Sequence, residues 1–168
     1  MRQDGGGISP RASAAHPAHR DLFTNFANMI TPKEILDLLK STESYRVERT
    51  TSTGNMDKFC EAICAFSNDM PGSRKNGYLI IGASDDGSIA GMRVDDALLK
   101  KIAGIRSDGN ILPLPTMSVE RFPFPEGDLL VAEVRPSDLP PVRYRSRTFI
   151  RVGPRRDIAT EAEERILA

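Results

Sequence analysis

Two carboxylates in the stretch ESYRVERT have the chemistry of metal ligands. Glu43 and Glu48 lie five positions apart, where a strand is expected to begin. Carboxylate oxygens are the hard ligands that Mg²⁺ and Mn²⁺ prefer, and such an ion activates water for attack on a phosphodiester. Residues five apart on a regular strand point to opposite faces, so convergence on one ion requires Glu43 to lie off the strand. The alternative is structural, with Glu43 solvated in a loop and Glu48 paired with Arg46 or a neighbouring strand.

A run of arginines near the C-terminus has the chemistry of phosphate contacts. Residues 141–156, PVRYRSRTFIRVGPRR, hold six arginines and no acid. We expect a hairpin here with its turn near Ser146, and alternate residues of a strand share one face. Arginines on one face suit phosphate binding. The alternative interpretation is that these arginines only form the solvated outer face of an antiparallel sheet. The candidate contacts are Arg143, Arg145, Arg147 and Arg151.

The charge balance excludes attraction of nucleic acid by the molecule as a whole. The 168 residues contain 23 basic and 23 acidic side chains, so the formal net charge is zero. Any binding must therefore come from a local basic surface. No apolar run approaches the ~18 residues that would predict a membrane span.

The two cysteines indicate a reduced, cytoplasmic protein. Cys60 and Cys64 are too few for a disulfide framework, and they lie one helical turn apart among apolar residues. No third or fourth ligand stands at zinc spacing, so a buried core position is the simpler interpretation. Both histidines fall in the first 25 residues, whose Gly, Ser, Ala and Pro content predicts a flexible tail.

Local patterns predict alternating helices and strands in residues 26–168. Helix 32–40 opens with a capping box formed by Thr31 and Glu34, and Asn55 caps the next helix. The expected helices are 32–40, 55–68, 94–105 and 160–167. The expected strands are 45–50, 77–83, 88–92, 116–124, 128–134 and a hairpin over 142–152. This order predicts an α+β or mixed α/β fold, a compact single domain with a largely antiparallel sheet and two or three packed helices.

Several motifs together resemble one known family. ESYRVE is followed by ICAFSN, by GYLIIGASDDGSIAG, and later by PPVRYR and FIRVG. In this order and spacing they are similar to the Schlafen AlbA-type domain, also called divergent AlbA, which is common in bacterial regulators. The resemblance covers roughly residues 31–166. It implies a compact α/β domain that contacts nucleic acid.

The resemblance also implies a site in the ribonuclease members of the family, where three acidic positions bind a divalent metal. Matched by motif, they fall on Glu43, Glu48 and Asp85, which would hold Mg²⁺ or Mn²⁺. Two departures stand out. Arg49 and Thr50 follow Glu48 where the family usually has an aromatic residue and a lysine. The link DMPGSRKNG, residues 69–77, is longer than usual and adds two basic residues as candidate nucleic-acid contacts, Arg74 and Lys75.

The leading functional prediction is a non-enzymatic nucleic-acid-binding domain, the sensor or DNA-contact part of a bacterial transcriptional regulator. No cofactor is then required. One alternative is a ribonuclease that uses the acidic trio with Mg²⁺ or Mn²⁺. The other is a dimerisation or protein-interaction domain of a larger ATPase-like protein, suggested by exposed strand edges and the apolar stretch ILPLP. Convergence of the acidic trio on one metal ion would favour the ribonuclease over the non-enzymatic domain. The oligomeric state tests the dimerisation domain.

Overall fold

The computed structural model describes residues 30–41 and 45–168, and residues from Thr31 onward form one compact unit. Its centre is a four-stranded sheet in the order β1-β2-β5-β4. The strands are β1 Val47–Thr50, β2 Gly77–Ile81, β5 Gly127–Val134 and β4 Met117–Phe124. β1 runs parallel to β2, and the other neighbours are antiparallel. The fold is α+β, as the sequence predicted, with a mixed sheet.

Four helices are described: α2 Pro32–Lys40, α3 Met56–Asn68, α4 Asp96–Gly104 and α5 Glu161–Leu167. The predicted helices match them to within two residues at either end. Helix ends are predictable because the capping side chains bond to residues only three positions away in the sequence. Thr31 and Glu34 form the capping box of α2, and the Asn55 side chain accepts a hydrogen bond from the amide of Lys58. None of these helices is long and apolar enough to cross a membrane.

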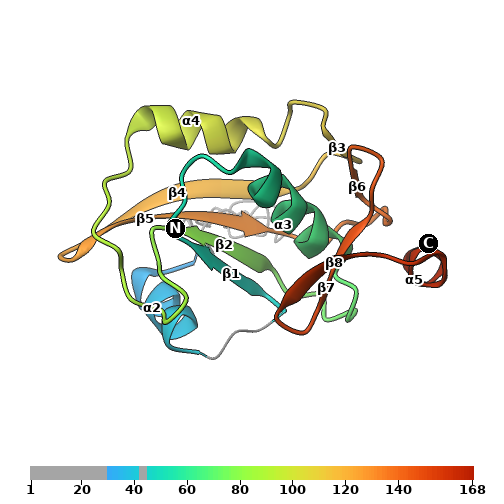
Figure 1. The fold of residues 1–168 in the computed structure, drawn as a ribbon, viewed down its shortest axis with the longest axis horizontal. Coiled ribbons are helices and arrows are strands. Elements are labelled where there is room, and N and C mark those ends of the chain that lie inside the picture. The colour runs from blue at the N-terminus through green and yellow to red at the C-terminus, as the bar shows by residue number, and fades with distance from the viewer. Residues whose placement is uncertain (1–29, 42–44) are drawn as a thin grey trace, which may run out of the picture. The chain divides into compact units, whose positions relative to one another are not determined.

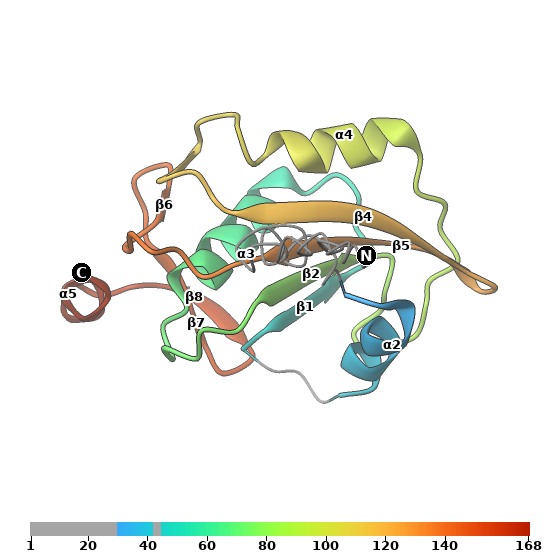
Figure 2. The same ribbon diagram turned by 180° about the vertical axis from the view of Figure 1, so that it is seen from behind.

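The sheet buries its two faces against different elements (Figures 1 and 2). Leu79 and Ile81 of β2 belong to the same core cluster as the apolar side of α3. Ile80 points to the opposite face, and its register partner on β1 is Arg49. Arg49 in turn binds the C-terminal end of α2, through Nη1 to the Leu39 carbonyl oxygen at 2.8 Å. Alternate residues of β1 therefore serve α3 on one side and α2 on the other.

Two small sheets lie beside the central one, in the region where the sequence predicted a single hairpin over 142–152. β3 (Ile111–Leu112) pairs with β6 (Arg143–Tyr144), and β7 (Phe149–Val152) pairs with β8 (Arg155–Ile158). β3 and β8 were not predicted, because both are short and are defined by their partners. The predicted strand over 88–92 is reduced to a single bridge between Ala83 and Ile89.

One buried side chain ties α3 to these small sheets. Asn68, at the last position of α3, donates from Nδ2 to the carbonyl oxygens of Val142 at 2.9 Å and Phe149 at 2.7 Å. Its Oδ1 accepts the amide of Val142 at 2.7 Å. Buried backbone groups need partners, so Asn68 fixes where the segment before β6 and the start of β7 lie against the helix.

Candidate nucleic-acid interface

The arginine hairpin, residues 143–147, is a tight turn rather than a strand face. Arg145 and Ser146 have φ of 46° and 68°, and the backbones of Tyr144 and Arg147 exchange two hydrogen bonds across them. Positive φ at both central positions is the geometry of a two-residue hairpin turn. Arg145 therefore sits at the tip of the turn, and the predicted single face through Arg143, Arg145 and Arg147 does not form.

Acidic residues from elsewhere approach two of these arginines. Arg143 Nε lies 3.6 Å from Glu164 of α5, and Arg145 Nη1 lies 3.2 Å from Asp57 of α3. The Arg145 guanidinium also stacks on the Tyr144 ring, 5.2 Å from its centroid. Arg147 is exposed and makes no ion pair with any described residue. The hairpin sequence contains no acidic residue, but the fold brings Glu164 and Asp57 next to its arginines.

The Tyr144 hydroxyl helps to hold this turn against α3. It donates to Asp57 Oδ1 at 2.5 Å, while the ring packs beside Phe149. Burial, together with the hydrogen bond to the Asp57 carboxylate, raises the pKa of Tyr144 above its ordinary value. Tyr144 thus stays a neutral hydrogen-bond donor at physiological pH, and the turn keeps its place.

Arg151 lies inside the protein rather than beside the other arginines. Its side chain is 4 % exposed, and Nη1 donates to Glu48 Oε2 at 2.8 Å. Nη2 donates to the carbonyl oxygens of Val47 and Pro154, and the guanidinium lies over the Phe66 ring. Contacts of this kind fix the end of β7 to β1. The sequence pattern showed the arginine but not its burial.

Glu48 carries the other half of the same ionic cluster. Besides Arg151, it accepts a hydrogen bond from Arg156 Nη1 on Oε1 at 2.5 Å, and Arg156 also pairs with Glu61 at 3.2 Å. Glu48 is the register partner of Leu79, so it points to the α3 face of the sheet. Both of its oxygens are engaged by guanidinium groups, which is the structural role that the sequence left open as an alternative.

Of the other two members of the acidic trio, the structure describes only Asp85. Asp85 is exposed in the turn after β2, and this turn packs on the α2 side, where Gly87 lies against Leu39 and Arg49. Glu43 falls outside the described residues. Among the residues that the structure describes, no three acidic, cysteine or histidine side chains gather closely enough to hold a metal ion. The convergence of the trio therefore stays a prediction.

Arg74 and Lys75 lie exposed on the loop 69–76, which follows α3. Asp69 organises this loop: its carboxylate accepts hydrogen bonds from the Ser73 amide, the Ser73 hydroxyl and the Arg74 amide, at 3.1, 2.8 and 2.7 Å. Arg74 is held with φ of 57°, a conformation that non-glycine residues seldom adopt. The loop is thus a shaped support for its two basic side chains.

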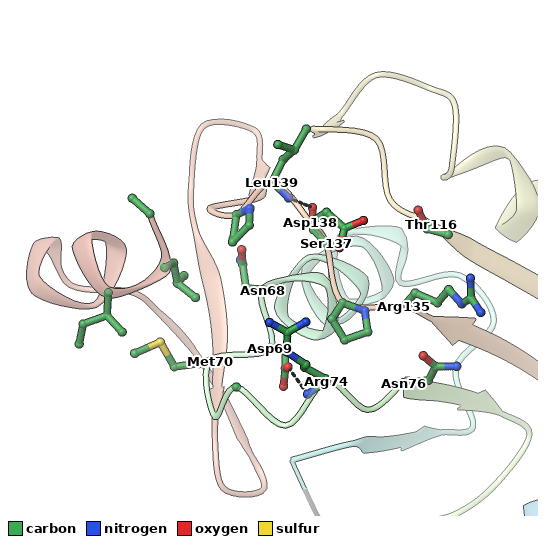
Figure 3. A pocket seen from close by; sticks show the side chains of 16 residues that line it. Asn68, Asp69, Met70, Arg74, Asn76, Thr116, Arg135, Ser137, Asp138 and Leu139 are labelled. Carbon is green, nitrogen blue, oxygen red and sulfur yellow. Dashed lines mark hydrogen bonds between the residues drawn. The ribbon is translucent and has the colours of Figure 1, made fainter.

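A hollow of about 1150 Å³ opens beside this loop (Figure 3). Its other walls are the segment 135–140 after β5 and the end of α5. Arg74 lines it from the loop, and Arg135 lines it from the segment after β5. Asp69 and Asp138 line it as well, so its charges are mixed. Arg135 was missed by the sequence analysis, because a single arginine after a strand carries no pattern.

Comparisons with known proteins find similar solved structures and one family. The N-terminal domain of a RecG-related protein from Nitrosomonas europaea, named after an ATP-dependent DNA helicase, is 23 % identical over 66 % of this chain and 76 % of that one, with a TM-score of 0.48. The DIP2311 protein from Corynebacterium diphtheriae is 20 % identical with a TM-score of 0.50, over 87 % of this chain but only 32 % of that longer one. No curated protein matches the sequence. The family model described as Schlafen, AlbA_2 matches residues 43–160, and the chain belongs to that family.

Proposed function

We propose that this domain binds nucleic acid through the phosphate backbone, as the contact part of a regulatory protein. The observation that carries the proposal is the tip of the arginine hairpin, where Arg143, Arg145 and Arg147 are exposed within five residues. Guanidinium groups suit phosphate because they are always charged and present several donors in one plane. Membership of the Schlafen AlbA_2 family supports the same assignment.

The ion pairs of the hairpin do not prevent phosphate binding. The side chains of Arg145 and Asp57 are each 64 % exposed, and those of Arg143 and Glu164 are 44 % and 32 % exposed. Exposed pairs of this kind contribute about 0–1 kcal/mol, so a phosphate can replace the carboxylate at little cost. Arg151 is not included among the contacts, since its guanidinium is buried against Glu48.

The proposal is tested by the salt dependence of binding. We expect a fluorescein-labelled oligonucleotide to bind, with an affinity that falls steeply between about 50 and about 200 mM salt, because bound phosphates release counterions. Arg147→Gln should weaken binding to every sequence and lower the slope of log K against log salt by about 1. The matched control is Arg93→Gln, an exposed arginine of the loop before α4.

Fluorescence anisotropy provides the measurement, and thermal denaturation checks that each variant is folded. Arg93→Gln should bind as the unmodified chain does, which shows that the loss at Arg147 is not a general effect of net charge. Binding that does not change with salt, or an equal loss in both variants, would contradict a phosphate contact at the hairpin.

A further inference from the structure

The last helix, α5, is attached loosely to the rest of the domain. None of its residues is buried, and Ile166 is 72 % exposed. Both ribbon views show α5 outside the body of the domain, beyond β7 and β8 (Figures 1 and 2). So short a helix is unstable by itself in water, and in proteins most helical stability comes from packing. α5 can therefore separate from its neighbours at a small cost in free energy.

One side chain of α5, Glu164, joins the helix to the arginine hairpin. Its Oε1 accepts a hydrogen bond from the Thr148 hydroxyl and lies 3.6 Å from Arg143 Nε. Before the helix, the Ala159 amide donates to the Thr148 carbonyl oxygen at 2.8 Å, so the backbone is held up to this residue. The Arg143 backbone is fixed by the pairing of β6 with β3. A movement of α5 would therefore take Glu164 away and leave Arg143 in place.

The charge of α5 is opposite to that of the hairpin. The helix carries three glutamates in its first turn, Glu161, Glu163 and Glu164, and one arginine, Arg165. Glu161 and Glu164 line the same hollow as Arg143 and Arg165, and Glu161 pairs with Arg165 at 3.6 Å. A phosphate that approaches Arg143 thus meets the Glu164 carboxylate beside the guanidinium group. The two anions repel each other and compete for the same cation.

We infer that α5 is an autoinhibitory element of the arginine hairpin. While Glu164 lies on Arg143, the guanidinium charge is partly neutralised and the phosphate contact is weakened. When α5 leaves, Arg143 acts together with Arg145 and Arg147. The inference rests on the proposed function and adds to it the regulation of the same surface. The side chains of Arg143 and Glu164 are 44 % and 32 % exposed, so the inhibition is graded rather than complete.

Glu164→Gln tests the inference, because it removes the charge and keeps an oxygen that can accept the Thr148 hydroxyl. The probe is a fluorescein-labelled duplex of about 12 base pairs, and fluorescence anisotropy measures its binding to the full chain. Glu164→Gln should tighten binding by about two- to fivefold, the range expected for removal of an exposed ion pair.

The matched control is Glu126→Gln, which makes the same change of charge in the exposed turn between β4 and β5. This turn lies at the end of the domain opposite α5 (Figure 1). Salt screens exposed charges beyond about 10 Å at 0.1 M, so Glu126→Gln should leave the affinity unchanged. An equal gain in both variants would overturn the inference, because net charge alone would explain it.

Arg143→Gln shows whether the gain depends on the contact itself. In a chain that carries Arg143→Gln, the addition of Glu164→Gln should give no gain in affinity, because no guanidinium group is left to be released. A gain as large as in the unmodified chain would also overturn the inference, since Glu164 would then act on the other arginines rather than through Arg143.

Removal of α5 measures the whole effect. A chain that ends at residue 160 loses the three glutamates together with Arg165, and it should bind the duplex at least as tightly as the Glu164→Gln variant. Its slope of log K against log salt should be steeper by up to about 0.9, because Arg143 adds one phosphate contact. Thermal denaturation checks that each protein is folded. If this shorter chain does not fold, the Glu164→Gln comparison still decides.

The outcomes separate the inference from the proposed function. If Arg147→Gln weakens binding while Glu164→Gln leaves it unchanged or weakens it, α5 is not inhibitory and the proposed function still stands. If neither the unmodified chain nor the Glu164→Gln variant binds the duplex or its single strands, the proposed function fails, and the inference fails with it.

Discussion

Glu48 shows how an acidic residue that resembles a catalytic group can be structural. Its two oxygens hold Arg151 and Arg156, and Arg151 is almost fully buried. A buried cation that loses its carboxylate stays uncompensated in a medium of low polarity, which costs far more than the loss of a surface pair. Replacing Glu48 is therefore a poor test of catalysis, because the fold itself depends on this side chain. Asp85, exposed in its turn, is the better residue for testing a metal site.

We expect Glu48→Ala to lower the free energy of unfolding by about 3–5 kcal/mol, the cost of breaking a buried ion pair. The control is Glu61→Ala, which removes the more exposed partner of Arg156 and should cost no more than about 1 kcal/mol. Urea denaturation of both variants measures the difference. A Glu48→Ala variant as stable as Glu61→Ala would show that Arg151 and Arg156 do not need this carboxylate.

The cysteines of α3 predict loss of stability at alkaline pH. Burial is the main cause that raises the pKa of Cys60 and Cys64 to about 11, from 9.0. The folded state thus prefers the protonated thiol. This preference costs nothing below pH 9, and the free energy of unfolding falls as pH rises from about 9 to about 11. Urea denaturation at about pH 8 and about pH 10 should show the decline, and it should be smaller in a Cys60→Ala/Cys64→Ala variant. An equal decline in both proteins would assign it to other groups.

At the scale of elements, the junction of α2, β1 and the turn after β2 is the most constrained. Arg49 is 6 % exposed and donates to carbonyl oxygens at the end of α2, where the helix carries partial negative charge. Gly87, from the turn, lies against the same place. Arg49 therefore serves the packing of these elements against one another.

Gly87→Ala should separate these elements. An added Cβ would lie 2.1 Å from the Leu39 carbonyl oxygen and 3.1 Å from Arg49 Nη1, at a φ of +86°. Strain at such a φ alone costs about 1–3 kcal/mol, and the contact with rigid backbone adds to it. Gly54→Ala is the control, because nothing lies within 4 Å of its added Cβ. Thermal denaturation should give a much lower midpoint for Gly87→Ala only, and similar midpoints would refute the close approach.

Elements were predictable from sequence where local rules define them. Thr31 with Glu34, and Asn55, mark helix starts within one residue, and β4 and β5 follow from a turn between two regular strands. Pairing between distant segments was not predictable, so β8 and the partnership of β3 with β6 were missed. The same limit applies to the site. A run of arginines marked the hairpin, but only the fold shows that Arg151 is buried and that Arg135 lines a hollow with Arg74.

Over the whole molecule, equal numbers of acidic and basic residues make the placement of charge decisive. A net charge of zero provides no long-range attraction, so the proposed binding depends on the arginine hairpin. This hairpin lies in the unit that begins at Thr31, whereas the first 25 residues are predicted to be a flexible tail. The part from residue 26 onward should then suffice for folding and for binding.

Two fragments test this expectation. Residues 26–168 should keep the free energy of unfolding and the salt-dependent affinity of the full chain. Residues 33–168 lack Thr31, whose amide donates to Glu34 Oε2 at 2.7 Å and whose hydroxyl accepts the Glu34 amide at 3.2 Å. Loss of this cap should cost about 0.5–2 kcal/mol in urea denaturation, because the first amides of α2 lose their acceptor. A fragment 26–168 that is less stable than the full chain, or that binds oligonucleotide more weakly, would show that the first 25 residues belong to the folded, binding unit.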